Sequence, residues 1–186
     1  MNRNLLEKGF IPQEICTHIP NGFEDVEEIS SSLHKILANN QISNVVNEID
    51  QEKDISSLST SQLERAMLLY SYIGHAYMWG KEDIDDIIPK NIAITWYKIS
   101  EKLRRPPILS YASYALNNLS LLDESKPLTV ENIKILQNFL SGVDEDWFIM
   151  IHVAIEHEAK NILGSLKKYF LDEDTEKENL EDALVS

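Results

Sequence analysis

Cysteine is almost absent from this chain, and long apolar runs are absent altogether. The 186 residues include one cysteine, Cys16, so the sequence can form neither an internal disulfide nor a cysteine-based zinc site. No apolar run approaches the roughly 18 residues that a membrane-spanning helix needs. Glu7 and Gly9 interrupt the N-terminus too early for a secretory signal. These absences predict a cytoplasmic protein that does not enter a membrane.

Basic residues are scarce as well. The sequence has 17 Lys and Arg against 31 Asp and Glu, which gives a formal net charge of −14 at pH 7. Such a charge disfavours binding to nucleic acid or anionic lipid through a general electrostatic field, so we expect neither as a partner. Acidic residues are concentrated in residues 172–186, and we predict that this segment is a solvated tail.

The sequence motifs of several enzyme classes are also missing. There is no P-loop, no dinucleotide-binding Gly-x-Gly-x-x-Gly and no Gly-x-Ser-x-Gly nucleophile elbow. The positions of Ser110 and Ser113 give no indication of nucleophilic activation. The Glu-x-x-His pairs of di-iron bundles do not occur. Residue spacing therefore predicts no catalytic residue and no metal site.

Five histidines are present, and one of them has two open interpretations. His152 and Glu156 are four residues apart, so on a helix both side chains can face one pocket. Alternatively, His152 is hydrogen-bonded within the core. The other candidates are assigned structural roles, namely a solvated His157 and core positions for His75, Trp79 and Trp96.

The pattern that is present is helical. Apolar residues recur at helical spacing in residues 24–39, 42–49, 61–77, 90–103, 106–119, 129–140 and 144–170. Ser61-x-x-Glu64 is a candidate capping box, and Gly80 is a candidate left-handed C-terminal cap. Residues 149–155 also alternate like a strand, but nothing else indicates β-structure, so the predicted fold class is all-α. The last segment carries an apolar stripe of Phe148, Ile151, Ile155, Ala159, Ile162 and Leu166.

The segment over residues 104–119, RRPPILSYASYALNNL, is unusually rich in small residues. Pro106 and Pro107 suit the first turn of a helix, where a missing N–H leaves no bond unmade. Small residues either let a second helix approach closely or form one wall of a cavity. The spacing favours close packing and leaves the cavity open.

Three blocks of the sequence resemble one known family. They are AYMWG at residues 76–80, IIPKNIAITWYKISEKLRRPPILSYASYALNNL at residues 87–119, and KPLTVENI at residues 126–133. In order, spacing and content they are similar to the N-terminal half of the indoleamine 2,3-dioxygenases. The resemblance extends over about residues 63–168, and its most distinctive block is Pro-Pro-Ile-Leu-x-Tyr-Ala.

The resemblance implies an all-helical fold with haem b as cofactor. Family members add both atoms of O₂ across the indole C2–C3 bond of L-tryptophan or a related indole, which gives N-formylkynurenine and opens the kynurenine pathway of tryptophan catabolism. Phe148 matches an aromatic residue that packs on the indole. His152 matches a histidine that hydrogen-bonds the indole N–H in the related tryptophan 2,3-dioxygenases. By position, the implied substrate and distal haem pocket comprises Tyr111, Tyr114, Ala115, Phe148 and His152.

The resemblance also implies what the sequence does not contain. The family's iron-binding histidine, an arginine for the tryptophan carboxylate and a glycine-rich loop belong to a C-terminal half without a counterpart here. We therefore expect a truncated member with a small helical region at residues 1–103, the start of the haem-pocket domain at 104–171 and the acidic tail at 172–186. One hypothesis is a shortened or incomplete tryptophan dioxygenase. The alternative is a non-catalytic helical interaction module, or pseudoenzyme, derived from the family, in which a second copy, a partner chain or the repacked tail covers the remaining half of the pocket.

Overall fold

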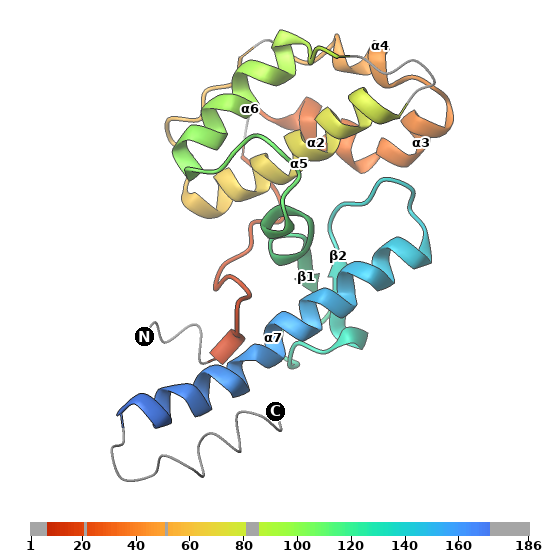
Figure 1. Cartoon of the computed structure of the whole chain (residues 1–186). Coiled ribbons are helices and arrows are strands. Elements are labelled where there is room, and N and C mark those ends of the chain that lie inside the picture. Colours follow the sequence, from red (N-terminus) through yellow and green to blue (C-terminus); the bar gives the residue numbers. More distant parts are fainter. Residues whose placement is uncertain (1–6, 21, 51, 81–85, 172–186) are drawn as a thin grey trace.

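The computed structural model describes residues 7–20, 22–50, 52–80 and 86–171. This part of the chain is mostly helical, which confirms the predicted fold class (Figure 1). One part is built around helix α5 and another along helix α7, and each has its own cluster of buried apolar residues. The expected acidic tail lies outside the described residues, and the domain boundaries remain predictions.

Helix α5, Thr60–Trp79, is the centre of the first part. It is buried on almost every side, as its all-round apolar pattern predicted. Its neighbours are α2 (Glu24–Ser31), α3 (Leu33–Ala38), α4 (Ile42–Val46) and α6 (Lys90–Leu103). Gly74 lets α6 approach closely, because a Cβ atom at Gly74 would lie 2.5 Å from the Trp96 ring. Trp96 is a core residue as predicted, whereas the core position predicted for Trp79 is wrong, since that side chain is 61% exposed.

The caps of α5 differ from those predicted. Its capping box uses Ser59 and Gln62 instead of Ser61 and Glu64. The Ser59 hydroxyl accepts from the Gln62 backbone, and the Gln62 side chain accepts from the Ser59 backbone. The predicted left-handed cap at Gly80 is wrong, because Gly80 has a φ of −84°.

Two other helix ends also depart from the sequence pattern. The helix predicted over residues 24–39 is divided into α2 and α3, because Ser32 leaves helical geometry with φ −105° and ψ 7°. A left-handed C-terminal cap is found on α6, for which none was predicted: Arg104, the residue after this helix, has a φ of 53°.

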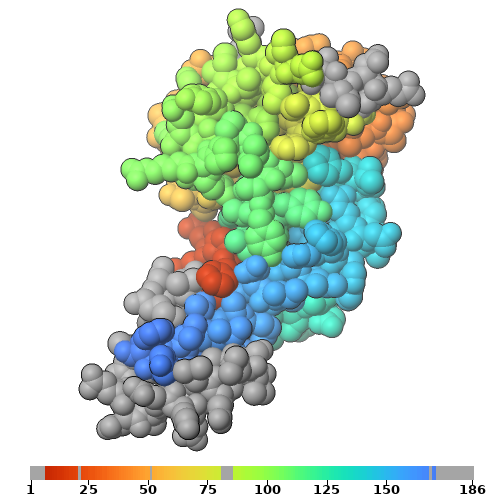
Figure 2. Space-filling view, in the orientation of Figure 1, coloured from red at the N-terminus to blue at the C-terminus, as the bar shows by residue number. Residues whose placement is uncertain are grey.

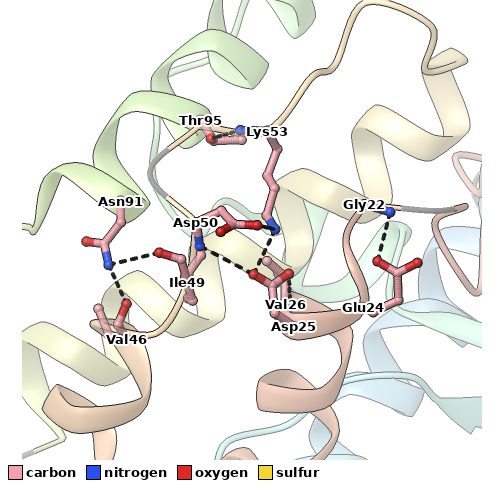
Figure 3. Close-up of polar contacts among 10 residues, drawn as sticks. All are labelled: Gly22, Glu24, Asp25, Val26, Val46, Ile49, Asp50, Lys53, Asn91 and Thr95. Atoms are coloured by element: carbon pink, nitrogen blue, oxygen red, sulfur yellow. Dashed lines mark hydrogen bonds and ion pairs between the residues drawn. The ribbon is translucent and has the colours of Figure 1, made fainter.

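A buried lysine fastens the loop before α5 to α2 and α6 (Figure 3). The Lys53 side chain is 7% exposed, and its Nζ donates to Asp25 Oδ2 at 2.7 Å and to Asp50 Oδ2 at 3.0 Å. Its backbone N–H donates to Thr95 Oγ1 on α6 at 3.0 Å. Burial disfavours the charged amine, but the hydrogen bonds and charges of the two aspartates outweigh it and raise the pKa of Lys53.

The second part contains a small sheet that the sequence did not predict. Within the described residues, β1 (Leu119–Leu121) and β2 (Ile133–Ile135) form one antiparallel pair, with Leu119 opposite Ile135. The helix predicted over residues 129–140 is therefore wrong, because a short 3₁₀ turn, η2 (Val130–Asn132), leads directly into β2. Strands of three residues are too short to show a two-residue period.

The helix predicted over residues 106–119 is wrong as well. After the two prolines the chain first makes tight turns, in which the N–H groups of Ile108 and Ser110 each bond two residues back. Helical structure begins at Tyr111 and takes the π form over η1, Ala112–Leu116. The prolines lack an N–H, and steric conflict before each of them disfavours α-helical geometry, so α6 and η1 cannot be continuous.

A buried asparagine joins the two parts of the molecule. Asn118 is fully buried, and its Nδ2 donates to the carbonyl of Gln137 at 2.7 Å and to the Tyr72 hydroxyl of α5 at 3.3 Å. Its Oδ1 accepts from the Gln137 backbone at 2.8 Å. The Gln137 side chain then donates to the carbonyl of Ser30 on α2 at 2.9 Å. This network connects the end of η1, the segment after β2 and two helices of the first part.

Helix α7, Val143–Leu171, agrees closely with its predicted bounds, and the residues that alternate like a strand belong to it. One side is buried in the second cluster through Ile149 and Val153. The apolar stripe lies on the other side, with exposed fractions of 53% for Phe148, 60% for Ile155 and 39% for Ile162. An apolar stripe of this length normally faces a core, so its exposure calls for a functional explanation.

The N-terminal residues pack against α7 through a glycine. Gly9 has a φ of +63°, and a Cβ atom there would lie 2.1 Å from the carbonyl oxygen of Glu156. The next residue, Phe10, donates its N–H to that same carbonyl oxygen at 3.0 Å. Backbone thus meets backbone at a point where only glycine fits.

Replacing Lys53 by alanine is expected to destabilise the protein by about 2 kcal/mol, because it leaves Asp25 without its cationic partner in a partly buried site. Urea denaturation measures this loss. The control is Lys98→Ala, which breaks a surface pair with Glu52 and should cost less than about 1 kcal/mol. Equal losses in the two variants would contradict a structural role for the Lys53 cluster.

Replacing Gly9 by alanine is expected to destabilise the protein by about 2–3 kcal/mol, because a Cβ atom would collide with α7 and the φ is unfavourable for other residues. Gly142→Ala is the matched control, since no atom lies within 4 Å of a Cβ placed there. Thermal unfolding of both variants checks the expectation, which fails if Gly9→Ala melts with the wild type.

Candidate functional site

The candidate site lies where η1 packs against the first turns of α7. The two segments meet at the surface, the green segment against blue α7 in Figure 2. The π form of η1 is shown by the N–H of Asn117, which bonds the carbonyl of Ala112 five residues back. Single π turns are frequent at functional sites, because they redirect side chains that a regular helix would place elsewhere.

Four of the five predicted pocket residues form a row of ring contacts. The Tyr114 and Phe148 ring centroids are 6.1 Å apart, those of Phe148 and His152 are 4.2 Å apart, and those of Tyr111 and His152 are 5.9 Å apart. Tyr111 and Phe148 are 44% and 53% exposed. We call Tyr111, Tyr114, Phe148 and His152 the aromatic cluster. It is an open aromatic surface and not an enclosed pocket.

The fifth residue, Ala115, is not part of this surface. Ala115 is fully buried, one residue beyond Tyr114. Within the described residues, the buried hydroxyl oxygens of Ser110 and Ser113 have no hydrogen-bond partner. Both serines belong to the segment that carries Tyr111 and Tyr114.

His152 is held in one tautomer by its own helix. Its Nδ1 lies 2.7 Å from the carbonyl oxygen of Phe148, and a carbonyl can only accept, so Nδ1 carries the hydrogen. In the neutral ring, Nε2 is then an acceptor. The side chain is half-buried between the Phe148 and Tyr111 rings. It is hydrogen-bonded to the backbone, as the structural interpretation expects, but it is not enclosed in the core.

The carboxylate of Glu156 completes the site, although the family resemblance does not include this residue. The Tyr111 hydroxyl donates to Glu156 Oε1 at 2.8 Å. Burial and then the hydrogen bond and charge of Glu156 raise the pKa of Tyr111 to about 12, so the phenol stays protonated. The i, i+4 spacing of His152 and Glu156 was the available signal, but it could not identify the tyrosine that connects them.

The other histidines lie outside the site. The expectation of a solvated His157 is wrong, because this side chain is buried between Lys8 and Lys160, with Nε2 2.6 Å from Lys160 Nζ. Burial and then the nearby lysine lower the pKa of His157. His75 is half-buried on α5, with Nδ1 2.8 Å from the Ser71 carbonyl oxygen, which supports its structural role.

Two further features of the described residues bear on ligand binding. Among the residues that the structure describes, no group of three or more His, Cys, Asp and Glu side chains could hold a metal ion. No described helix is long and apolar enough to cross a membrane. A surface hollow of about 590 Å³ lies between residues 52–56 and α6, where lysines and carboxylates alternate. It contains none of the aromatic cluster.

The sequence is similar to known proteins over most of its length. A family model described as indoleamine 2,3-dioxygenase matches residues 5–186. Indoleamine 2,3-dioxygenase 1 of Rattus norvegicus is 29% identical over 175 residues, which are 89% of this chain and 43% of the relative. Indoleamine 2,3-dioxygenase of Saccharomyces cerevisiae is 31% identical over 138 residues, which are 70% of this chain and 30% of the relative. The chain thus spans less than half the length of these relatives.

The matched region contains every residue of the aromatic cluster, and the match extends over nearly the whole chain. On these grounds the chain belongs to the indoleamine 2,3-dioxygenase family.

Proposed function

We propose that this chain supplies the substrate-facing wall of a haem-dependent dioxygenase that converts L-tryptophan to N-formylkynurenine. The observation that supports it most is the fixed tautomer of His152, whose Nε2 is an acceptor within an aromatic surface. An indole presents one N–H donor and a flat apolar ring. The aromatic cluster offers the complementary groups.

The residues present suit one side of a haem site. The exposed rings of Phe148 and Tyr111 offer an apolar surface on which a flat group can lie. Bound haem b would supply the iron that activates O₂. His152 accepts the indole N–H, while Phe148 and Tyr114 pack against the ring and exclude water. No residue of this chain is assigned as the iron ligand.

The apolar stripe of α7 supports a site that further polypeptide completes. The stripe continues from the aromatic cluster along α7 and is exposed at Ile155 and Ile162. More than half the length of the relatives lies outside the region that this chain matches. We propose that polypeptide corresponding to that length covers the stripe and closes the pocket, with the complete unit located in the cytoplasm.

The exposed stripe also favours a second candidate function. A contiguous apolar surface on a folded protein marks an interaction site, whether or not a cofactor is present. In this alternative the chain is a non-catalytic helical module that binds another protein through α7, and the aromatic cluster is part of that interface.

A chimaera tests the first proposal. This chain, joined to the remaining length of the rat relative, is expected to bind haem and form N-formylkynurenine from L-tryptophan. Replacing His152 by alanine should lower kcat/KM roughly fivefold to tenfold, because one hydrogen bond of about 1 kcal/mol is lost. Tryptophan methylated at the indole nitrogen is the control, since it has no N–H and should not respond to the substitution. A folded, haem-loaded chimaera without product would contradict the proposal.

The stripe can be tested on the chain alone. We expect the chain to self-associate as its concentration rises or to bind a hydrophobic dye, because the stripe is exposed. The double variant Ile155→Glu, Ile162→Glu should abolish whichever of these properties is observed. Sedimentation and dye fluorescence measure these properties. Ile87→Glu is the matched control, because Ile87 is 80% exposed and lies away from α7 in the sequence. A wild-type chain that is monomeric and binds no dye argues against an interaction surface on α7.

A further inference from the structure

We propose that Glu156 is a positioning residue of the candidate site, and that it acts by holding Tyr111 against His152. This inference rests on the proposed function. The Tyr111 hydroxyl donates to Glu156 Oε1 at 2.8 Å, and the Tyr111 ring meets the His152 ring edge-on, with the planes at 72°. Tyr111 therefore spans one turn of α7, from Glu156 to His152.

Tyr111 needs such an anchor because packing covers only part of its side chain. It follows the tight turns after the two prolines, at the start of the π turn, and 44% of it is exposed. A hydrogen bond to a carboxylate is stronger than one between neutral groups. Without it, the phenol ring gains other rotamers and no longer occupies one position beside His152.

Glu156 is itself fixed from the opposite side. Its carbonyl oxygen accepts from the N–H of Phe10 at 3.0 Å and lies against Gly9. The N-terminal residues, α7 and the segment before η1 thus converge on one residue. The backbone of Glu156 is held by the N-terminus, while its side chain holds Tyr111.

The contact between Glu156 and Tyr111 limits the directions in which His152 Nε2 can point. The Phe148 carbonyl oxygen fixes Nδ1, but a single hydrogen bond leaves the ring free to tilt about it. The ring contacts with Phe148 on one side and Tyr111 on the other restrict that tilt. Glu156 therefore controls the orientation of the acceptor without touching the substrate.

The test is the NMR signal of the His152 ring protons in the isolated chain with ¹³C-labelled histidine, assigned with His152→Asn. Tyr111→Ala removes the ring and defines the shift of an uncovered His152. Glu156→Leu is expected to move the signal towards that value. Glu156→Gln keeps an acceptor oxygen and should retain the wild-type shift. Glu158→Leu, which removes an exposed carboxylate of the same helix, is the control and should change nothing.

Two outcomes would overturn the proposal. One is a wild-type His152 signal in Glu156→Leu. The other is an additional shift when Glu156→Leu is combined with Tyr111→Ala, compared with Tyr111→Ala alone. The effect of Glu156 would then not pass through Tyr111. Tyr111→Phe removes the same hydrogen bond from the other partner and should reproduce Glu156→Leu, so a folding defect of one variant does not decide the result.

The NMR measurement needs neither haem nor product, so it separates this proposal from the proposed function. In the chimaera, Glu156→Leu should lower kcat/KM for L-tryptophan roughly threefold to tenfold and Glu156→Gln should restore it. An NMR effect without any activity in the wild-type chimaera contradicts the proposed function and leaves the link between Glu156 and Tyr111 intact. Normal kcat/KM in Glu156→Leu contradicts the positioning role.

Discussion

The buried amide network around Asn118 is the interaction on which the arrangement of the molecule depends. A fully buried amide that lacks partners costs free energy, so the groups around Asn118 have to stay in one relative position. Those groups belong to α5, α2 and the segment after β2, which are far apart in the sequence. Because Asn118 lies two residues beyond the end of η1, the same network helps to fix where the π turn lies against α7. The candidate site is thus located in part by polar contacts outside the aromatic cluster.

The parts of the fold that the sequence predicted are those with long, regular patterns. Helices α5, α6 and α7 each repeat their apolar spacing over several turns, so local pattern and tertiary packing agree. The two strands could not be found, because three residues show no period and their pairing depends on the Asn118 network. The helix after Pro107 was predicted from small residues at helical spacing, but tight turns after the prolines delayed its start to Tyr111. In α7 the period was correct, but the period alone did not show that the stripe would be exposed while Ile149 and Val153 are buried.

The candidate site was predictable to a similar degree. Family resemblance indicated Tyr111, Tyr114, Phe148 and His152, and the structure brings their rings together. It could not indicate Glu156, because the contact with Tyr111 joins residues of different segments. It also could not foresee that Ala115 is buried while the stripe of α7 is open. Both facts depend on how η1 and α7 pack, which is decided by tertiary contacts.

The π turn at η1 has a consequence for how such a site can change. Successive residues of an α-helix are rotated by about 100°, and each turn holds about 3.6 residues. A π turn closes its hydrogen bond over one more residue, so it accommodates one extra residue within a single turn. Deleting one residue between Ala112 and Leu116 would restore α-helical winding and leave Tyr111 and Asn118 in nearly the same relative position, because the π turn is what absorbs the extra residue. A single-codon deletion would therefore remove the local bulge in the wall of the site, while the residues on either side kept their identity and their placement. Insertions and deletions are thus a route of divergence that substitutions at individual positions cannot reproduce.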